Sequence, residues 1–329
     1  MKILRHSKFD LAASQLSRAL DQRQPGTAIF LVGPSGVGKT TLRHAVLKSV
    51  YGDPVHWPVG AVPVIETIAT LPTNSYYNSK SLATELIDQL DRPTLPWIDA
   101  HHKSSQLNVF VSNIDGLDDR FRADRGRRRL SESEQWRTLE RYIKARGCLV
   151  VSIDQATALL KNRKTKDPTD HMLHLMTFAE KAGVTLLLTG VPEVAELWNI
   201  HQELRRRVDV VWMPPYGEKS QGDRVEFAKL LSSFHRKYPQ VPMDLFRSLD
   251  TVFLAASGGV YAELERLLVR SINRAADDGR STVEKVDVEK SAHSQSDLEA
   301  LWRGIHIFQN FMRAGSLDVR VSEIAKVWP

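Results

Sequence analysis

The sequence has little cysteine and no long apolar run, and both shortages narrow what the protein can be. Cys148 is the one cysteine in 329 residues, so the disulfide framework of a secreted domain is excluded. No segment approaches the roughly 18 consecutive apolar residues that cross a bilayer. The start of the chain, Met1–His6, lacks the apolar centre of a secretory signal. We therefore expect a cytoplasmic protein without a membrane partner.

Low-complexity tracts and internal repeats are also missing. The composition is that of an ordinary folded chain, with 42% hydrophobic and 26% charged residues. Charge is slightly unbalanced, because 45 Lys and Arg outnumber 39 Asp and Glu. A surplus of this size points to a polyanionic partner only where its charges gather in one place.

Short apolar runs alternate with helical periodicity in the first two thirds of the chain, which is typical of a parallel sheet between layers of helices. The runs lack strict alternation, as strands covered on both faces do. We predict five strands, at Ala28–Val32, Val62–Thr67, Leu149–Ile153, Val184–Thr189 and Val208–Met213. Helices are predicted between them at Thr40–Val50, Ser81–Leu90, Ser131–Ala145, His171–Lys181 and Val194–Arg206.

Pro214 and Pro215 end this alternation, and the rest of the chain has helical periodicity. We predict helices at Asp223–Tyr238, Met243–Ala256, Val260–Ala276 and Lys285–Ala292. The predicted organisation is an α/β core over residues 1–215, a helical lid over 216–292, and a terminal helix with a tail over 293–329. Residues 91–130 interrupt the core as an insertion, with one extra strand at Leu107–Ile114 and a charged loop.

The terminal helix has its own signals. Ser296 and Glu299 have the spacing of a capping box and open the helix. One face is apolar and carries Leu298, Leu301, Trp302, Ile305, Phe308 and Met312. This face is expected to pack on the lid, and the alternative is that the short tail with Trp328 serves as a docking peptide for a partner.

A glycine-rich segment with the pattern Gly-x-x-x-x-Gly-Lys-Thr lies between the first predicted strand and a helix. In this pattern backbone N–H groups surround a β-phosphate, and the glycines allow an approach that side chains block. Lys39 reaches the β- and γ-phosphates, and the Thr40 hydroxyl ligates Mg²⁺. The sequence therefore predicts a site for ATP and Mg²⁺, made by Gly33, Pro34, Ser35, Gly36, Val37, Gly38, Lys39, Thr40 and Thr41.

The third predicted strand ends in an acidic residue, Asp154, where a phosphate site needs a carboxylate for the water shell of the metal. We assign Asp154 and Thr40 to the metal. Many ATPases of this architecture have a glutamate next, which polarises the attacking water, but this chain has Gln155. Glutamine orients water without taking up its proton. We therefore predict an ATPase whose hydrolysis is slow or supported by another group.

With both phosphate motifs placed, the chain resembles the AAA+ superfamily, and within it the TnsC/TniB-like ATPases that regulate DNA transposition. The resemblance extends from about Arg5 to Ala292. Outside the glycine-rich loop it rests on Ser152–Ala156, Leu186–Glu193, the pair Gly258 and Gly259 leading into Leu264–Leu268, and the leader residues His6, Phe9 and Asp10. It implies a P-loop NTPase three-layer αβα core with a five-stranded parallel sheet, followed by a small helical lid.

The resemblance also implies a ring or filament of identical subunits with ATP at each seam. Thr189 matches the polar residue that senses the γ-phosphate, although a threonine also ends a buried strand without any function. Arg205, Arg206 and Arg207 match the position of the arginine finger, and a guanidinium suits a bidentate phosphate contact. A solvated helix end explains at least one of the three.

The lid departs from the pattern of the superfamily. Many members place an arginine a few residues after the glycine pair, where it touches the nucleotide. Ala262 and Glu263 occupy that neighbourhood here, and Arg266 is the nearest candidate.

Basic residues gather in two predicted loops. Residues 120–130 hold six arginines and one aspartate, and residues 161–167 hold four basic residues and one acid. In a ring these loops face the central channel, where we expect them to contact DNA phosphates without strong sequence preference. A solvated run of charge is the plainer alternative. The candidate DNA contacts are Lys103, Arg120, Arg122, Arg125, Arg127, Arg128, Arg129, Lys161, Arg163, Lys164 and Lys166.

The resemblance thus implies an ATP-dependent regulator of transposition that oligomerises on double-stranded DNA and links a target-selection protein to the transposase. Gln155 favours a first alternative of the same fold, a non-hydrolysing ATP-gated scaffold. A second alternative is a protein of the replication-initiator or helicase-loader type, for which the segment after Ala292 is short. A small-molecule kinase needs an acceptor site and a catalytic carboxylate that the sequence does not reveal.

Overall fold

A computed structural model describes residues 6–69, 77–91, 93–94, 130–161, 168–199, 202–218 and 220–312. The chain forms two compact units. The sheet unit comprises Phe9–Val32 and Lys39–Val211. The helical unit comprises Met1–Lys8, Gly33–Gly38 and Trp212–Pro329. The predicted division of the chain into three parts stays a prediction.

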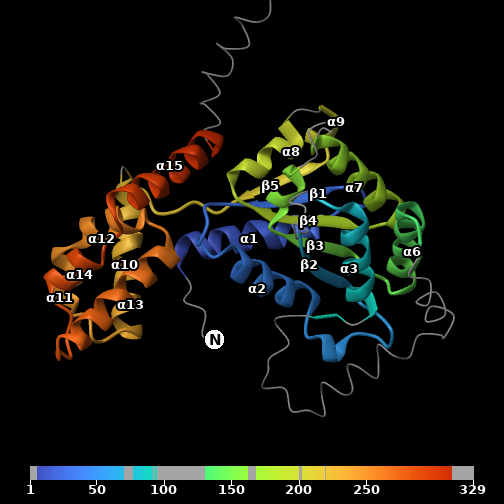
Figure 1. Ribbon diagram of the computed structural model, residues 1–329. Coiled ribbons are helices and arrows are strands. Elements are labelled where there is room, and N and C mark those ends of the chain that lie inside the picture. Colours follow the sequence, from blue (N-terminus) through green and yellow to red (C-terminus); the bar gives the residue numbers. More distant parts are fainter. Residues whose placement is uncertain are drawn as a thin grey trace, which may run out of the picture. The chain divides into compact units, whose positions relative to one another are not determined.

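A five-stranded sheet is the centre of the sheet unit, with helices around it (Figure 1). Its strands are β1 (Ala28–Val32), β2 (Val64–Ile68), β3 (Val150–Asp154), β4 (Thr185–Gly190) and β5 (Val208–Trp212). The strand order is β2-β3-β4-β1-β5, and β1 with β4, β4 with β3 and β3 with β2 are parallel pairs. The predicted fold class, a parallel α/β sheet with a helical C-terminal region, is confirmed.

Burial explains why these segments form the sheet. Every residue of β1, β3 and β4 is buried, whereas the edge strands β2 and β5 are partly exposed. Strands buried on both faces have continuous apolar sequences, which is why the sequence reveals them. The bounds of β1 are those predicted, and the other four strands differ by one or two residues at their ends.

The single cysteine lies directly before β3. Cys148 is buried, at 4% exposure. Burial raises the pKa of its thiol to about 12, because the thiolate is disfavoured away from water. Cys148 is therefore an unreactive core residue in the folded protein.

Long helices flank the strands in the chain. They are α1 (Ser7–Asp21), α2 (Lys39–Tyr51), α3 (Ser79–Asp91), α6 (Glu132–Ala145) and α7 (Pro168–Ala182). All but α1 overlap a predicted helix. The buried residues Phe9, Ala12, Leu16 and Leu20 of α1 have helical spacing, which is the signal that could have predicted it.

The prediction of one helix over Val194–Arg206 is wrong. The chain instead forms a 3₁₀ turn, η4 (Pro192–Ala195), then the short helices α8 (Glu196–Asn199) and α9 (Gln202–Arg205), with residues 200–201 outside the description. Val194, Leu197, Trp198 and Leu204 are all buried, and Leu204 keeps helical spacing because it lies seven residues after Leu197. The apolar pattern therefore continues through these short elements, so the sequence could not show that they are separate.

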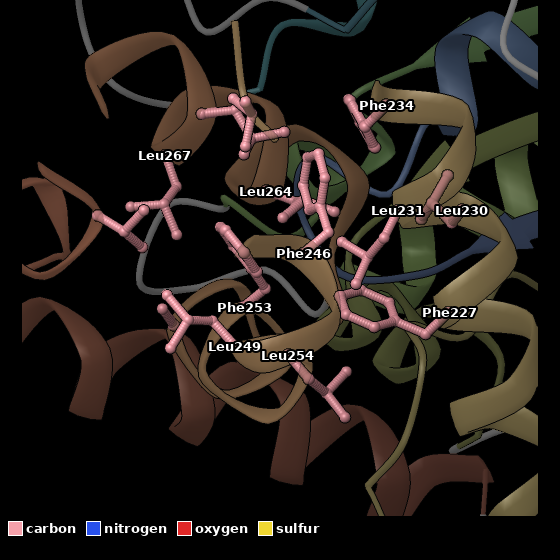
Figure 2. Close-up of a cluster of buried hydrophobic side chains, with 14 of the residues drawn as sticks. Phe227, Leu230, Leu231, Phe234, Phe246, Leu249, Phe253, Leu254, Leu264 and Leu267 are labelled. Carbon is pink, nitrogen blue, oxygen red and sulfur yellow. The ribbon is translucent and has the colours of Figure 1, made fainter. Parts of the chain in front are cut away.

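The helical unit packs around one apolar cluster (Figure 2). Its helices are α10 (Gln221–Lys237), α11 (Met243–Ser248), α12 (Asp250–Ser257), α13 (Tyr261–Asp277), α14 (Lys285–Ser291) and α15 (Gln295–Met312). In α10 the buried residues recur at helical spacing, so this helix presents one apolar stripe to the cluster. The cluster includes Phe227, Leu230, Leu231, Phe234, Phe246, Phe253, Leu254, Leu264 and Leu267.

Two helix predictions in this unit need correction. The predicted helix Met243–Ala256 is interrupted at Leu249, which has φ −118° and ψ 22° and buries its side chain. The apolar periodicity continues across the interruption, so the sequence pattern could not show it. The terminal helix begins at Gln295 rather than Ser296, because Ser294 Oγ accepts a hydrogen bond from the backbone N–H of Asp297 at 3.3 Å.

Helix α15 packs against the rest of the helical unit. Ile305 and Phe308 are buried, and the Phe308 ring meets the Trp212 ring edge-on at 5.7 Å between centroids. Trp302 Nε1 donates to the Ala255 carbonyl at 3.0 Å. A Cβ on Gly258 would collide with Ile305, so glycine is required for this approach. These contacts favour the packing alternative for the helix, while Trp328 lies outside the described residues.

The predicted insertion over residues 91–130 lies mostly outside the described residues, and its strand Leu107–Ile114 lies entirely outside them. No helix in the described part of the chain is both long and apolar enough to cross a membrane.

Candidate functional site

The glycine-rich loop needs its glycines for two separate reasons. Gly36 and Gly38 have φ of 78° and 103°, a region that residues with side chains rarely adopt. Gly33 has no such angle, but a Cβ there would lie 2.5 Å from the Met213 carbonyl oxygen. The backbone therefore requires the glycine spacing that the sequence analysis singled out.

Helix α13 begins directly against this loop within the helical unit. The backbone N–H of Ala262 donates to the Gly36 carbonyl at 3.1 Å, and a Cβ on Gly36 would lie 3.0 Å from the Ala262 Cβ. The start of α13 and the loop are therefore in direct contact at Ala262 and Gly36. Arg266 has a largely exposed side chain whose guanidinium lies 3.4 Å from Glu263.

The leader segment contacts the same unit. His6 Nδ1 and the Tyr216 hydroxyl form a hydrogen bond of 2.9 Å. The His6 ring also stacks on the Tyr261 ring, with 6.2 Å between centroids and 9° between planes. Lys8 forms an ion pair with Asp223 at 2.7 Å. The leader, on which the resemblance partly rests, is thus fixed to α10 and α13.

Lys39 begins α2 in the sheet unit. Burial lowers the pKa of its amine to about 8, while the charges of Asp154 and Glu193 act in the opposite direction. A phosphate next to Lys39 would compensate this desolvation and favour the charged form. The chemistry of this position therefore suits an anionic ligand.

Thr40 and Asp154, both assigned to the metal from the sequence, lie together. Thr40 Oγ1 donates to Asp154 Oδ2 at 2.9 Å, and the other carboxylate oxygen accepts from the Gln155 backbone N–H at 2.8 Å. A hydroxyl and a carboxylate are hard oxygen ligands of the kind that Mg²⁺ takes. The residues present fit a magnesium ion bound through Thr40 and the water shell held by Asp154.

A buried ion-pair network adjoins this pair, and the sequence analysis missed it. Arg43 Nη1 lies 3.2 Å from Asp154 Oδ2, and Arg43 Nε lies 3.0 Å from Glu66 Oε1. His44 Nε2 lies 3.4 Å from the other Glu66 oxygen. Burial raises the pKa of the Glu66 carboxyl to about 7, although the positive charge of Arg43 acts to lower this pKa. The signal available in the sequence was Glu66 itself, an acid inside a predicted buried strand.

A cavity of about 440 Å³ opens beside this network in the sheet unit. Thr40 and Asp154 contribute to its wall, so it is continuous with the predicted metal position. The rest of its lining is Arg43, His44, Glu66, Thr67, Ile68, Glu85, Asp88, Gln89 and Thr94. All of the lining residues except Ile68 have polar or charged side chains.

Gln155 has a strained backbone. Its φ of 53° and ψ of 38° lie in the left-handed region, and no other non-glycine residue of the described chain has a positive φ. Such conformations cost free energy and cluster at functional sites. The side chain is exposed, so the strain is not explained by packing of Gln155 into the core.

Two buried oxygens at the end of β4 have no hydrogen-bond partner. Thr189 Oγ1 is one, and Thr189 is fully buried. The other is Oε2 of Glu193, the second residue of η4. Unpaired buried polar atoms are rare and costly, so each needs an explanation such as a missing ligand. The resemblance implies that Thr189 senses phosphate, whereas no role for Glu193 follows from the sequence.

The three candidate finger arginines differ in their surroundings. Arg207 Nη1 binds Glu180 Oε2 at 2.7 Å, and Arg207 Nη2 lies 3.8 Å from Glu203. The Arg207 backbone carbonyl accepts from the Ala28 N–H, which ties it to the sheet. Arg205 and Arg206 are exposed. The structure thus engages Arg207 within its own subunit.

Most of the candidate DNA contacts cannot be placed. Lys161 is described and exposed at the end of the turn after β3. The remainder lie outside the described residues, namely Lys103, Arg120, Arg122, Arg125, Arg127, Arg128, Arg129, Arg163, Lys164 and Lys166.

A family model described as an AAA domain matches residues 22–198, more than half of the chain. The match includes the glycine-rich loop, Asp154 and Thr189. No curated protein matches the sequence significantly.

Solved structures with the same fold include three archaeal proteins. The Walker-type ATPase PABY2304 of Pyrococcus abyssi has a TM-score of 0.56 and 18% identity, over 92% of this chain and 75% of its own. Cdc6p of Pyrobaculum aerophilum has a TM-score of 0.57 and 17% identity, over 88% and 68%. The ORC2 protein of Aeropyrum pernix, in its ADP form, has a TM-score of 0.53 and 13% identity, over 88% and 68%. At these identities the likeness shows the fold alone.

Proposed function

The chain belongs to the AAA domain family, and from this premise we propose that it is an ATP-gated regulator of DNA transposition. In this proposal the ATP-bound protein oligomerises on double-stranded DNA and links a target-selection protein to the transposase. The chemistry of the phosphate site supports the ATP-gated part. The short motifs that resemble TnsC/TniB-like ATPases support the transposition part.

Each chemical task of a nucleotide site has a candidate residue in this chain. The loop from Gly33 to Gly38 offers backbone N–H groups to the phosphates, and Lys39 neutralises the β- and γ-phosphates. Thr40 and Asp154 would hold a magnesium ion, which would supply charge compensation at the phosphates. The buried Thr189 hydroxyl, which has no hydrogen-bond partner, supports a role for Thr189 as a donor to a γ-phosphate oxygen.

The main support for the ATP-gated proposal is the glutamine at position 155. It replaces a proton-accepting carboxylate by an amide, in a backbone conformation that costs free energy. ATP then stays bound for long periods. ATP and DNA stabilise the same assembled state, so each tightens the binding of the other.

Arg206 is the best candidate for the finger offered to a neighbouring subunit. Arg207 is held by Glu180 and Glu203 of its own chain, and its release would break these pairs. Arg206 has an exposed side chain next to it in the sequence. A planar guanidinium at this position suits a bidentate contact with phosphate.

Gln155→Glu tests the proposal. We expect steady-state phosphate release with DNA present to rise at least about tenfold, since a carboxylate restores a general base. ATP-dependent assembly on DNA, followed by light scattering and electron microscopy, should become shorter-lived. Gln240→Glu, the same change at an exposed position of the helical unit, should alter neither measurement. Equal and brisk turnover of the unmodified protein and Gln155→Glu would refute the ATP-gated reading.

The replication-initiator alternative stays open, because the likeness to Cdc6p and ORC2 shows the fold alone. An initiator of this kind selects particular DNA sequences, whereas a transposition regulator coats DNA with little preference. Binding to a random-sequence duplex library, sequenced after selection, separates the two. Strong enrichment of one motif would favour the initiator.

A further inference from the structure

We infer that Glu193 supplies the carboxylate for ATP hydrolysis that position 155 lacks. The inference deepens the proposed function and rests on it, because it concerns the slow turnover of the same site. Glu193 lies outside both phosphate motifs, in the turn that follows β4.

The topology brings this turn to the phosphate edge of the sheet. β4 lies between β3, which ends at Asp154, and β1, which leads into the glycine-rich loop. All three strands are parallel, so their carboxyl ends meet at one edge. Glu193 comes three residues after the end of β4. It therefore starts on the same edge as Asp154 and Lys39.

One carboxylate oxygen of Glu193 is buried, although the residue as a whole is partly exposed. Its Oε2 is buried and has no hydrogen-bond partner. Its charge acts on the Lys39 amine and favours the protonated form. A carboxylate oxygen that is buried beside a phosphate-binding lysine, and bonded to nothing, has the position and the free acceptor that an attacking water needs.

The turn is fixed next to the segment that carries Gln155. A Cβ on Gly190 would lie 3.0 Å from the Val194 Cβ and 3.3 Å from Thr157 Oγ1. No room exists at Gly190 for a larger residue, so the turn after β4 packs directly on the turn after β3. Glu193 thus belongs to a rigid neighbour of position 155, and pre-organisation of this kind is what a catalytic group requires.

The neighbouring threonine completes the arrangement. Thr189 Oγ1 is the second buried oxygen without a partner at the end of β4. A hydroxyl can donate to a γ-phosphate oxygen, while the Glu193 carboxylate accepts from water. One ligand, a γ-phosphate with its attacking water, would give both Thr189 Oγ1 and Glu193 Oε2 a hydrogen-bond partner.

The oxygen of a water molecule bonds to the γ-phosphorus as the bond between that phosphorus and the β–γ bridging oxygen breaks. ADP leaves with the electron pair of that bond. The proton of the water passes to the Glu193 carboxylate and from there to solvent. The Gln155 amide orients the same water through its carbonyl oxygen and takes no proton.

Glu193→Gln tests this assignment, with Glu196→Gln as the matched control, because Glu196 is exposed in the following helix. We expect Glu193→Gln to lower kcat for phosphate release at least about tenfold. The affinity for a fluorescent ATP analogue with Mg²⁺ should stay within about threefold, and Glu196→Gln should leave both unchanged. The double variant Gln155→Glu with Glu193→Gln should recover turnover, since the carboxylate returns on the neighbouring turn.

Other outcomes separate the possible failures. An unchanged kcat in Glu193→Gln overturns the inference, as does a protein that binds ATP without measurable turnover. A loss of ATP-analogue affinity equal to the loss of rate assigns Glu193 to the support of Lys39 instead, and also overturns it. Failure of the unmodified protein to bind ATP at all refutes the proposed function itself.

Discussion

At the scale of single residues, a buried arginine sets the charge around the predicted metal position. Arg43 contacts both Asp154 and Glu66, at 3.2 and 3.0 Å. Buried charges persist only when paired, because desolvation costs several kcal/mol per ion. Arg43 therefore holds the Asp154 carboxylate in place next to Thr40. His44 remains neutral here, since burial and Arg43 lower its pKa to about 4.

Sequence reasoning reached Lys39, Thr40 and Asp154 because their motifs are continuous in the chain. Arg43 and Glu66 meet only through the fold, since they are 23 residues apart on a helix and a strand. Glu193 likewise depends on the position of β4 between β3 and β1. Pairings of this kind need the strand order, which spacing in the sequence does not encode.

A carboxylate in the helical unit gives a pH-dependent stability. Asp287 is buried and accepts two bonds of 2.6 Å from Arg280, and these bonds lower its pKa to about 2. Its stabilising contribution is therefore present above the ordinary pKa near 3.8 and is lost as the pH falls from about 4 toward 2. We expect Asp287→Asn to cost about 2 kcal/mol in the free energy of unfolding at pH 7.

Urea denaturation of Asp287→Asn and the unmodified protein, at pH 7 and again at pH 3, measures this effect. The difference between them should shrink at pH 3. Asp278→Asn is the control, because Asp278 binds the same Arg280 from an exposed position. A difference that is equal at both pH values would exclude the ionised pair as its cause.

At the scale of secondary structure, the strands could be predicted from the sequence because most of them are buried on both faces. β1, β3 and β4 are completely buried, so their sequences are continuous apolar runs. Helix continuity was harder to predict. The interruption at Leu249 keeps the apolar period on both sides, and the turns after β4 follow from tertiary packing of Trp198 on Phe30, at 4.3 Å between ring centroids.

The terminal helix α15 offers a matched pair of phenylalanines. Phe308 is fully buried against Trp212, whereas Phe311 is 38% exposed on the same helix. We expect Phe308→Ala to destabilise the protein by about 3–5 kcal/mol, through lost burial and the cavity left behind. Phe311→Ala should cost less than about 1 kcal/mol. Urea denaturation compares them, and equal effects would contradict the packing of α15 described above.

At the scale of the whole molecule, the division into two units cuts through the phosphate motif. Gly33–Gly38 belongs to the helical unit by its contacts, while Lys39 and Thr40 belong to the sheet unit. The motif is continuous in sequence, so its pattern gave no hint of this division. The sequence predicted the fold class correctly because the alternation of strands and helices is a property of the entire chain.

The surplus of basic residues is also a property of the whole molecule. If the two basic clusters contact DNA, charge reversal of Arg127, Arg128 and Arg129 together with Lys161, Arg163, Lys164 and Lys166 should weaken binding by at least about 100-fold. The slope of log affinity against log salt should also become shallower by several units, since each phosphate contact contributes about 0.9. Fluorescence anisotropy with labelled duplex DNA, over a range of salt concentrations, measures both.

A control variant should carry reversed charges elsewhere on the surface. Lys229, Arg247 and Lys285 have exposed side chains in the helical unit and serve this purpose. Their reversal to glutamate should lower affinity only slightly. An unchanged salt slope in the cluster variant would show that the charges of these loops face solvent and do not contact DNA.

The buried cysteine makes the folded protein easy to label at chosen positions. Cys148 is shielded and holds its proton tightly, so a maleimide added to the folded protein has no native thiol to react with. A fluorophore can therefore be attached at any surface cysteine introduced by mutation, without removing a native one first. The slow rate at which Cys148 itself is labelled then measures how often the segment directly before β3 opens, in the same sample and under the same conditions.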